Sequence, residues 1–229
     1  MGYESPMPVQ EEVIPFLLGE DNDVIALAQT GTGKTAAYGL PILQKINVSQ
    51  YQPQALILCP TRELCLQIAD DLNDYSKYID NLKVLPVYGG SSIESQIKTL
   101  KRGVHVVVAT PGRLIDLMNR KTVDLSNVKN VILDEADEML NMGFRDDIET
   151  ILEYIPAEGR QTILFSATMP KPILDITRKY QHDAVNIKVV KKELTVPSIE
   201  QYYYDVKRSD KVEAVSYTHL RAHETGAYL

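Results

Sequence analysis

A glycine-rich segment near the N-terminus carries residue types that bind phosphate. It reads AQTGTGKT over residues 28–35 and follows an apolar run at 23–28. Glycines let the backbone curl so that several N–H groups face phosphate oxygens, and the N-terminus of a following helix adds partial positive charge. Lys34 provides a charge for the β- and γ-phosphates of a nucleotide, and the hydroxyl of Thr35 suits Mg²⁺. Ala28 stands where the strict motif begins with glycine, so a turn that only caps a helix is the alternative at this point.

A second segment ends an apolar run in acidic residues, an arrangement that completes such a site. It reads VILDEAD over residues 131–137. Asp134 lies where the expected strand stops, so its carboxylate can reach Mg²⁺ beside Thr35. Glu135 follows and can orient or deprotonate an attacking water, which makes Lys34, Asp134 and Glu135 the expected catalytic residues. A solvated acidic helix start is the alternative for this segment alone, and the glycine-rich segment upstream argues against it.

Short apolar runs alternate with helical segments along most of the chain. Each run is rich in Val, Ile and Leu without polar alternation, which is typical of strands buried on both faces of a parallel sheet. The segment 62–79 has apolar residues at helical spacing and suits a crossover helix. The pattern predicts a doubly wound, mostly parallel α/β domain with helices on both faces, whose ligands bind beyond the carboxyl ends of the strands. The apolar runs lie at 23–28, 55–59, 84–88, 104–109, 130–134 and 162–166.

Length and composition narrow the class of protein. A chain of 229 residues accommodates one large α/β domain and is short for two. The net charge of -7 argues against a protein that coats nucleic acid by bulk charge, yet a few placed cations and backbone N–H groups can still hold phosphates. The sequence has neither a membrane-spanning apolar run nor a signal-peptide pattern. With Cys59 and Cys65 expected to be reduced thiols, a cytoplasmic location is predicted.

The tetrad DEAD at 134–137 resembles the motif of the DEAD-box ATP-dependent RNA helicases, and further segments resemble other motifs of that family in the same order. The resemblance covers residues 2–211 and is greatest to bacterial cold-shock-type members. It implies a RecA-like P-loop NTPase fold, the cofactors ATP and Mg²⁺, and RNA as a partner that is held by its backbone, independently of sequence. The matching segments are GYESPMPVQ (2–10), PTRELCLQ (60–67), Gly89–Gly90, TPGR (110–113) and SAT (166–168).

The resemblance also implies roles for individual residues. Gln10 reads the adenine edge, which an amide with one donor and one acceptor can do, and Tyr3 packs near the base. The nucleotide-binding set is then Tyr3, Gln10, Thr30, Gly31, Thr32, Gly33, Lys34 and Thr35. The RNA-binding set is Arg62, Gly90, Thr110 and Arg113. Ser166 and Thr168 hydrogen-bond to Asp137 and tie the nucleotide site to the RNA side. Taken singly, these positions have structural alternatives: Thr110 as a helix N-cap, Gly90 as part of a turn, Ser166 as a strand-to-helix cap.

The chain is expected to consist of three segments: a folded lobe, a linker and a tail. Residues 1–190 form the ATP-binding lobe, 191–214 form a linker and the start of a second RecA-like lobe, and 215–229 form a non-native tail that resembles a translated sequencing adapter. A natural tail is the alternative for the last segment. No motif of the second lobe is recognisable after residue 211, so the chain alone is expected to lack turnover. Two functions compete with this interpretation: a nucleotide- or RNA-binding module without turnover, and another kind of P-loop motor. The oligomeric state is not predicted.

Overall fold

The computed structural model describes residues 4–29, 31–188 and 205–216. The chain divides into two units, residues 1–190 and 191–229, which are described separately. Within the second unit the described part contains a short 3₁₀ helix, Arg208–Asp210. The predicted linker at 191–214 and tail at 215–229 lie largely outside the described residues, so both assignments stay predictions.

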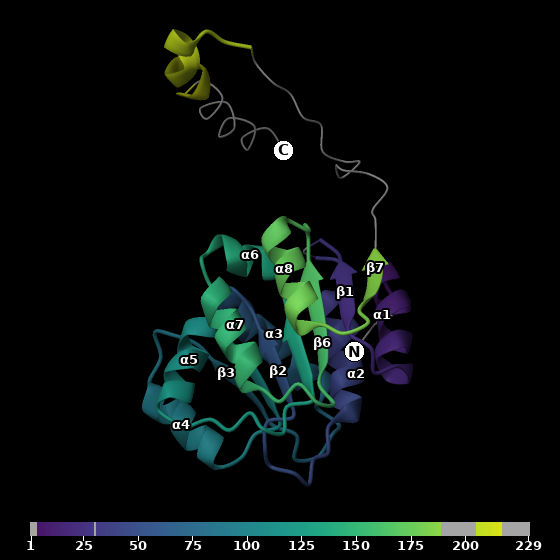
Figure 1. The fold of residues 1–229 in the computed structure, drawn as a ribbon. Coiled ribbons are helices and arrows are strands. Elements are labelled where there is room, and N and C mark those ends of the chain that lie inside the picture. The colour runs from purple at the N-terminus through teal and green to yellow at the C-terminus, as the bar shows by residue number, and fades with distance from the viewer. Residues whose placement is uncertain (1–3, 30, 189–204, 217–229) are drawn as a thin grey trace. The chain divides into compact units, whose positions relative to one another are not determined.

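The first unit is built on a seven-stranded sheet in the order β3-β4-β2-β5-β6-β1-β7 (Figure 1). Every strand pair is parallel, so the predicted parallel α/β sheet is confirmed. The strands are β1 (Val24–Leu27), β2 (Ala55–Leu58), β3 (Val84–Val87), β4 (Val106–Ala109), β5 (Asn130–Leu133), β6 (Gln161–Ser166) and β7 (Val185–Lys188). Sequence reasoning missed β7, because Ile187 is its one buried residue and an edge strand of this kind lacks an apolar run.

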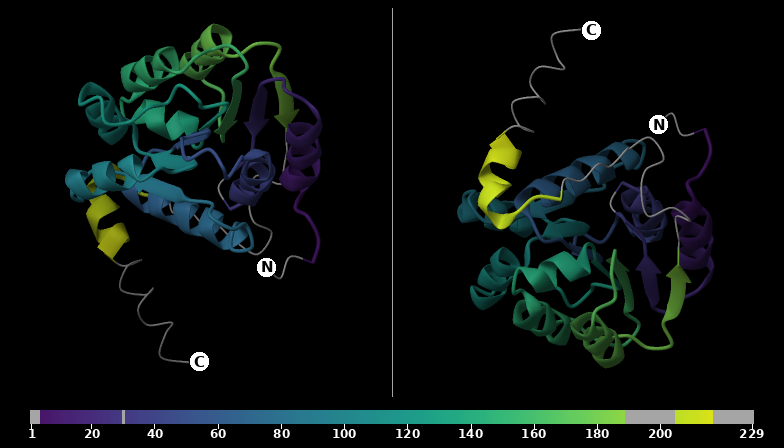
Figure 2. Two further views of the ribbon diagram at one scale, coloured as in Figure 1. Left: turned by 90° about the horizontal axis from the view of Figure 1, so that it is seen from below. Right: turned by 90° about the horizontal axis from the view of Figure 1, so that it is seen from above.

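In the part of the first unit that the structure describes, eight helices cover the two faces of the sheet (Figure 2). One face holds α1 (Pro8–Gly19), α2 (Lys34–Lys45) and α3 (Arg62–Tyr75), and the other holds α4 (Ile93–Lys101), α5 (Pro111–Asn119), α6 (Ala136–Asn141), α7 (Arg145–Tyr154) and α8 (Lys171–Tyr180). Side chains of β2 alternate between the two cores: Ala55 and Ile57 pack toward α1–α3, whereas Leu56 and Leu58 pack toward the other helices. This alternation explains why β2 is apolar at every position.

The predicted helix at 62–79 is shorter than expected. It starts after Thr61, whose hydroxyl accepts a hydrogen bond from the Leu64 N–H at 3.2 Å, and it ends at Tyr75. The Ser76 hydroxyl donates to the Leu72 carbonyl at 2.7 Å and so satisfies a carbonyl of the last turn. Ile79 still packs against the core from the turn that follows, which accounts for the helical spacing that extended the prediction.

All strands present their carboxyl ends at one edge of the sheet. The segments after β1, β2, β4, β5 and β6 contain AQTGTGKT, PTRELCLQ, TPGR, DEAD and SAT, in that order. The parallel topology therefore brings motifs that are far apart in sequence to one edge, where doubly wound folds bind ligands. Among the described residues, no helix is both long and apolar enough to span a bilayer.

Candidate functional site

The glycine-rich segment forms a tight loop between β1 and α2. Gly31 and Gly33 have φ values of 77° and 82°, which are left-handed conformations that favour glycine. A Cβ atom on Gly33 would lie 2.5 Å from Nε2 of Gln10, so the loop and the start of α1 approach too closely for a side chain there. The Thr32 hydroxyl donates to the Gln29 carbonyl at 2.7 Å and closes the loop from within.

A buried junction joins α2 to the end of β5. Nζ of Lys34 lies 3.3 Å from Oδ1 of Asp134, and the side chains are 7% and 4% exposed. The Tyr38 hydroxyl donates to Oδ2 of Asp134 at 3.0 Å. Within the described part of the chain, Oδ1 of Asp134 accepts no hydrogen bond although it is buried. One carboxylate oxygen is thus held by Tyr38, while the other has only the nearby ammonium.

Sequence reasoning missed Tyr38. The residue is fully buried, packs on Phe165 with ring centroids 5.3 Å apart, and lies one helical turn after Lys34. Burial and then the negative charge of Asp134 raise the pKa of the Tyr38 hydroxyl well above its ordinary value, so the hydroxyl stays protonated and can donate. The available signal was a hydroxyl-bearing ring at the i+4 position from the phosphate-binding lysine, which places both on one helix face.

Glu135 turns the chain sharply from β5 into α6. Its φ and ψ are 52° and 48°, a left-handed conformation that costs a non-glycine residue about 1–3 kcal/mol. The turn makes Glu135 line the same cavity, of about 360 Å³, as Lys34 and Asp134. Leu64, Gln67, Asp71 and Tyr75 of α3 also line this cavity, and sequence reasoning assigned none of these four to the site.

Gln10 connects the start of α1 to the glycine-rich loop. Its Oε1 accepts a hydrogen bond from the Met7 N–H at 2.9 Å, and its Nε2 donates to the Gly33 carbonyl at 3.2 Å. Since an amide has two acceptor lone pairs and two N–H donors, one of each remains for a ligand. The position beside the phosphate loop is compatible with the expected reading of a base, which stays a prediction. Tyr3 and Thr30 lie outside the described residues.

The residues expected to contact RNA gather around the ends of β2, β3 and β4. The Arg62 guanidinium lies over the Tyr88 ring, 5.1 Å from its centroid, and beside Gly90, whose φ is 83°. Arg113 donates to the Ser91 carbonyl at 3.1 Å and to Oε1 of Gln96 at 3.0 Å. The two arginines thus border the loop that contains Gly90.

Thr110 precedes α5 at the N-cap position, as its structural alternative predicted. Its hydroxyl makes no capping hydrogen bond in the described structure, and its N–H donates to the Val87 carbonyl at 3.0 Å. The side chain is therefore not needed for capping. Its expected role toward RNA, like those of Arg62, Gly90 and Arg113, remains a prediction.

A short hydrogen-bonded link joins the DEAD and SAT segments. The Thr168 N–H and hydroxyl both donate to Oδ2 of Asp137, at 3.0 and 2.7 Å, and the Ser166 hydroxyl donates to the Thr168 carbonyl at 2.6 Å. Burial pushes the pKa of Asp137 upward, but hydrogen bonds, led by those from Thr168, outweigh it and hold the pKa below its ordinary value. The expected hydrogen bond from Ser166 to Asp137 is not formed in the described structure, because the Ser166 hydroxyl donates to Thr168. The Ala28 N–H donates to the Ser166 carbonyl at 3.1 Å, so the link extends to the start of the glycine-rich loop.

The residues present fit a single Mg²⁺ ion. The Asp134 oxygen without a hydrogen bond and the Thr35 hydroxyl are hard oxygen donors of the kind that Mg²⁺ prefers. No group of three or more His, Cys, Asp or Glu side chains with metal-binding spacing occurs among residues 4–29, 31–188 and 205–216. An ion here would take its remaining ligands from phosphates and water, as Mg²⁺ commonly does in nucleotide sites.

A glycine-rich loop after β1, a lysine opening α2 and a carboxylate ending β5 define a P-loop nucleotide-binding domain of the RecA-like type. The family model described as DEAD/DEAH box helicase matches residues 7–176, and the chain belongs to that family. The resemblance found in the motifs, and the RecA-like fold inferred from it, are thereby confirmed.

Two curated relatives are similar over nearly the whole chain. The DEAD-box ATP-dependent RNA helicase CshA of Geobacillus kaustophilus (strain HTA426) is 51% identical over 216 residues, which cover 94% of this chain and 46% of that protein. The ATP-dependent RNA helicase CshA of Listeria monocytogenes serovar 1/2a is also 51% identical over 216 residues, 94% of this chain and 41% of the relative. The chain therefore spans less than half the length of these relatives.

Solved structures agree with this placement. A crystal structure of a DEAD box protein from the hyperthermophile Methanococcus jannaschii has a TM-score of 0.79 and 44% identity, covering 93% of this chain and 57% of that one. A hypothetical ATP-dependent RNA helicase from Sulfolobus tokodaii has a TM-score of 0.74 and 41% identity, covering 82% and 54%.

Proposed function

We propose that this chain is the ATP-binding lobe of an ATP-dependent RNA helicase, an RNA-stimulated ATPase that remodels short RNA duplexes in the cytoplasm. The observation that carries the proposal is the junction of Lys34, Tyr38 and Asp134. It leaves one buried carboxylate oxygen without a hydrogen bond beside a lysine and next to a cavity. A buried oxygen without a hydrogen bond costs free energy unless a ligand interacts with it. A metal-bound nucleoside triphosphate provides that interaction.

Each residue of the site has one task in this proposal. Lys34 and the N–H groups of the loop hold the β- and γ-phosphates, and Thr35 and Asp134 hold Mg²⁺, which when bound neutralises phosphate charge. Glu135 takes a proton from a water whose oxygen forms a bond to the γ-phosphorus. The bond from that phosphorus to the bridging oxygen breaks, and ADP leaves with the electron pair. Gln10 selects adenine, with Tyr3 beside the base.

RNA is proposed to lie along the edge formed by Arg62, Gly90, Thr110 and Arg113. Backbone N–H groups and hydroxyls there suit contacts to phosphates and 2′-hydroxyls, which are independent of base sequence. The hydrogen bonds between Thr168 and Asp137 are proposed to couple this edge to the nucleotide site. A second RecA-like lobe is the proposed partner that completes both sites.

Turnover tests the proposal most directly. In this proposal the second lobe supplies an arginine to the γ-phosphate across the cleft between the lobes. Such an arginine increases the rate of phosphoryl transfer by a factor of roughly 10³–10⁵. We therefore expect negligible phosphate release from the purified 229-residue chain with ATP, Mg²⁺ and single-stranded RNA. Adding a separately expressed second lobe from the Geobacillus relative is expected to restore release that RNA stimulates and DNA does not.

Two results of this assay would contradict the proposal. Robust RNA-stimulated turnover by the chain alone would show that a group of its own, or a second copy, completes the site. Turnover stimulated equally by DNA would place the chain among other P-loop motors.

A further inference from the structure

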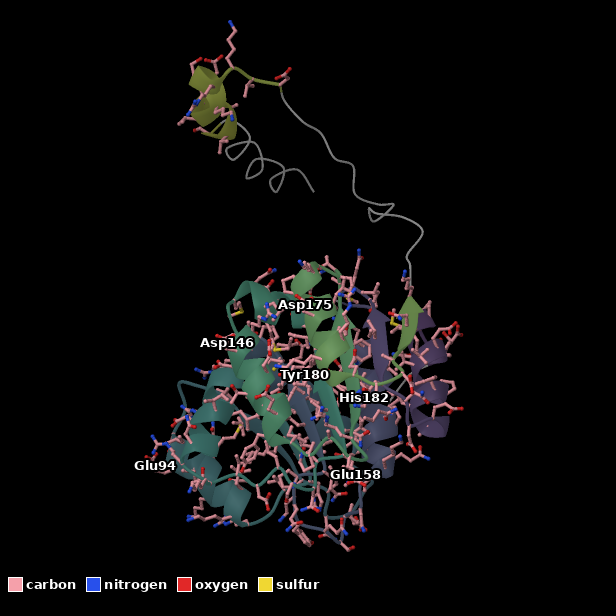
Figure 3. All side chains as sticks on the ribbon, viewed as in Figure 1. Glu94, Asp146, Glu158, Asp175, Tyr180 and His182 are labelled. Atoms are coloured by element: carbon pink, nitrogen blue, oxygen red, sulfur yellow. The ribbon has the colours of Figure 1, made fainter. Side chains whose placement is uncertain are left out.

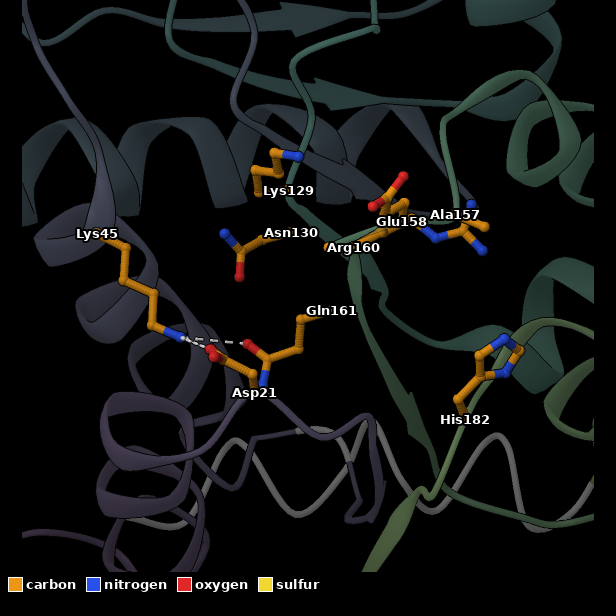
Figure 4. A pocket seen from close by; sticks show the side chains of 10 residues that line it. Asp21, Lys45, Lys129, Asn130, Ala157, Glu158, Arg160, Gln161 and His182 are labelled. Atoms are coloured by element: carbon orange, nitrogen blue, oxygen red, sulfur yellow. Dashed lines mark hydrogen bonds and ion pairs between the residues drawn. The ribbon is translucent and has the colours of Figure 1, made fainter.

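A second pocket lies at the opposite edge of the sheet from the nucleotide site. It has a volume of about 650 Å³ and is lined by residues where β5 and β6 begin, by the end of α2, and by the segments before β1 and β7 (Figure 4). These are the amino ends of parallel strands, whereas the nucleotide site lies at their carboxyl ends. In Figure 3, Glu158, one of its lining residues, lies toward the lower end of the domain, where the strands begin. Neither the motifs nor the proposed catalysis uses this pocket.

One residue that lines the pocket has a side-chain amide without a hydrogen-bonding partner in the described structure. Asn130, the first residue of β5, is 7% exposed and lines the cavity. Its side-chain amide makes no hydrogen bond within the described part of the chain, whereas the neighbouring Gln161 amide donates to the carbonyls of Glu20 and Asn22 at 3.1 and 2.8 Å. The amide atoms of Asn130 are not among the fully buried polar atoms without partners, so they are open to the cavity, and Asn130 can offer both N–H groups to a ligand there.

Two lysines add positive charge around this amide (Figure 4). Lys129 makes no ion pair or hydrogen bond through its ammonium in the described structure, and this ammonium lies beside Gly159. Lys45 is weakly held: its Nζ is 3.4 Å from Oε1 of Gln161 and 3.9 Å from a carboxylate oxygen of the fully exposed Asp21. Both ammonium groups can turn toward a ligand at little cost, because neither gives up a strong partner.

We propose that this pocket binds a small phosphate-bearing ligand. Its phosphate accepts hydrogen bonds from the Asn130 amide and from the ammonium groups of Lys45 and Lys129. A phosphate monoester carries up to two negative charges, which two lysines match. The cavity of about 650 Å³ has the size of a small-molecule site, and the carboxylates of Asp21 and Glu158, which also line it, add repulsion for each further phosphate of a long polyanion such as RNA. The ligand is therefore a small molecule that fits inside the rim.

The nucleotide site and the second pocket lie at opposite ends of α2 and β5. Ligand binding at one site can therefore be altered while the other site is kept. Helix α2 runs from Lys34 in the nucleotide site to Lys45 in the second pocket, a separation of roughly 17 Å along the helix axis. Strand β5 likewise begins at Asn130 and leads directly to Asp134. Because Lys34 does not line the second pocket, replacing it is expected to weaken phosphate binding at the glycine-rich loop and to leave the second pocket intact.

To test the proposal, the Lys34→Ala chain is titrated with inorganic phosphate in the absence of Mg²⁺. Binding is monitored through the backbone amide NMR signals. Signals of residues 45, 129 and 130 are expected to shift and saturate. Lys45→Gln and Lys129→Gln in that background are each expected to weaken binding about tenfold, the value of one charge-assisted hydrogen bond. Asn130→Asp is expected to abolish it, and Lys101→Gln, on the exposed lysine that ends α4, is the matched control.

Three results would overturn the proposal. The first is that phosphate shifts only residues 28–35 of the wild-type chain and nothing in Lys34→Ala. The second is that the double Lys45→Gln, Lys129→Gln chain binds as tightly as its parent. The third is that the pocket signals respond to a single-stranded RNA without terminal phosphates and not to inorganic phosphate. If Asn130→Asp unfolds, the two lysine variants, altered at exposed positions, still decide the question.

Discussion

The nucleotide site and the RNA-facing edge lie at the same end of the sheet, yet they are built differently. The RNA-facing edge consists of the proposed RNA contacts Arg62, Gly90, Thr110 and Arg113. In the nucleotide site the charged groups are buried and face one another, as Lys34 and Asp134 do at 3.3 Å. At the RNA-facing edge, Arg62 is exposed, and Arg113 donates to a backbone carbonyl of its own neighbourhood. A buried pair is sensitive to loss of either partner because the remaining charge is uncompensated. Exposed groups are individually replaceable, since water takes the place of the lost contact.

The largest effect is expected from Lys34→Ala. The substitution removes the cation proposed to contact ground-state phosphates and leaves Asp134 without the ion-pair partner that it has among the described residues. We expect ATP affinity to fall on the order of 100-fold or more, as for truncation of a buried charged partner. Titration with a fluorescent ATP analogue in the presence of Mg²⁺ measures this loss.

Glu135→Gln is the matched control for that variant. It changes a residue proposed to act on water, so its ATP affinity is expected to stay close to that of the wild type. An equal loss of affinity in both variants would show that the two residues do not divide binding and chemistry between them.

A smaller effect on a different property is expected from Gln10→Ala. If the remaining donor and acceptor of the amide read the adenine edge, discrimination between ATP and GTP falls by about 1–3 kcal/mol. Competition titration of both nucleotides against the wild type and the variant measures this difference. A wild-type chain that binds GTP as tightly as ATP would remove the adenine role and leave Gln10 as a structural contact between α1 and the loop.

Tyr38→Phe sharpens the contrast within the nucleotide site itself. The change deletes the hydroxyl that donates to Asp134 and keeps the buried ring. We expect a loss of about 1 kcal/mol, or roughly fivefold, in ATP affinity measured at saturating Mg²⁺. Without Mg²⁺, affinity is expected to be unchanged, because the hydroxyl acts through the carboxylate that holds the ion. An equal loss with and without Mg²⁺ would point to a packing defect instead.

The smallest effect is expected from Arg62→Ala at the RNA-facing edge. The free energy of unfolding is expected to change by no more than about 0.5 kcal/mol, as for most exposed positions, and ATP affinity is expected to be unchanged. RNA affinity is expected to fall, and the slope of log affinity against log salt to decrease by about 1. Arg102→Ala, at an exposed arginine after α4, is the control and should alter neither. Unchanged RNA binding in Arg62→Ala would show that this arginine does not contact RNA, and would contradict the contrast drawn between the two regions.

Features that depend on neighbouring residues in the sequence were predicted correctly, whereas features that depend on contacts with distant segments were missed or misplaced. Six strands were located because residues such as those of β2 are apolar at every position, a signal that does not depend on the partner strands. The missed strand β7 has one buried residue, and its strand conformation depends on pairing with β1. The end of α3 was misplaced because Ile79 keeps helical spacing while packing from a turn.

The sequence by itself determined the parallel α/β fold, the phosphate loop and the acidic end of β5, since short segments encode these through apolar runs, glycines and residue order. Tertiary structure alone decided which polar groups meet. Tyr38 and Asp134 are 96 positions apart and Gln10 and Gly33 are 23 apart, so no local pattern pairs them. The solitary amide of Asn130 is likewise invisible in the sequence. Apolar burial needs only an approximate environment, whereas a hydrogen bond needs a specific partner at a specific distance, and only the assembled sheet sets that distance.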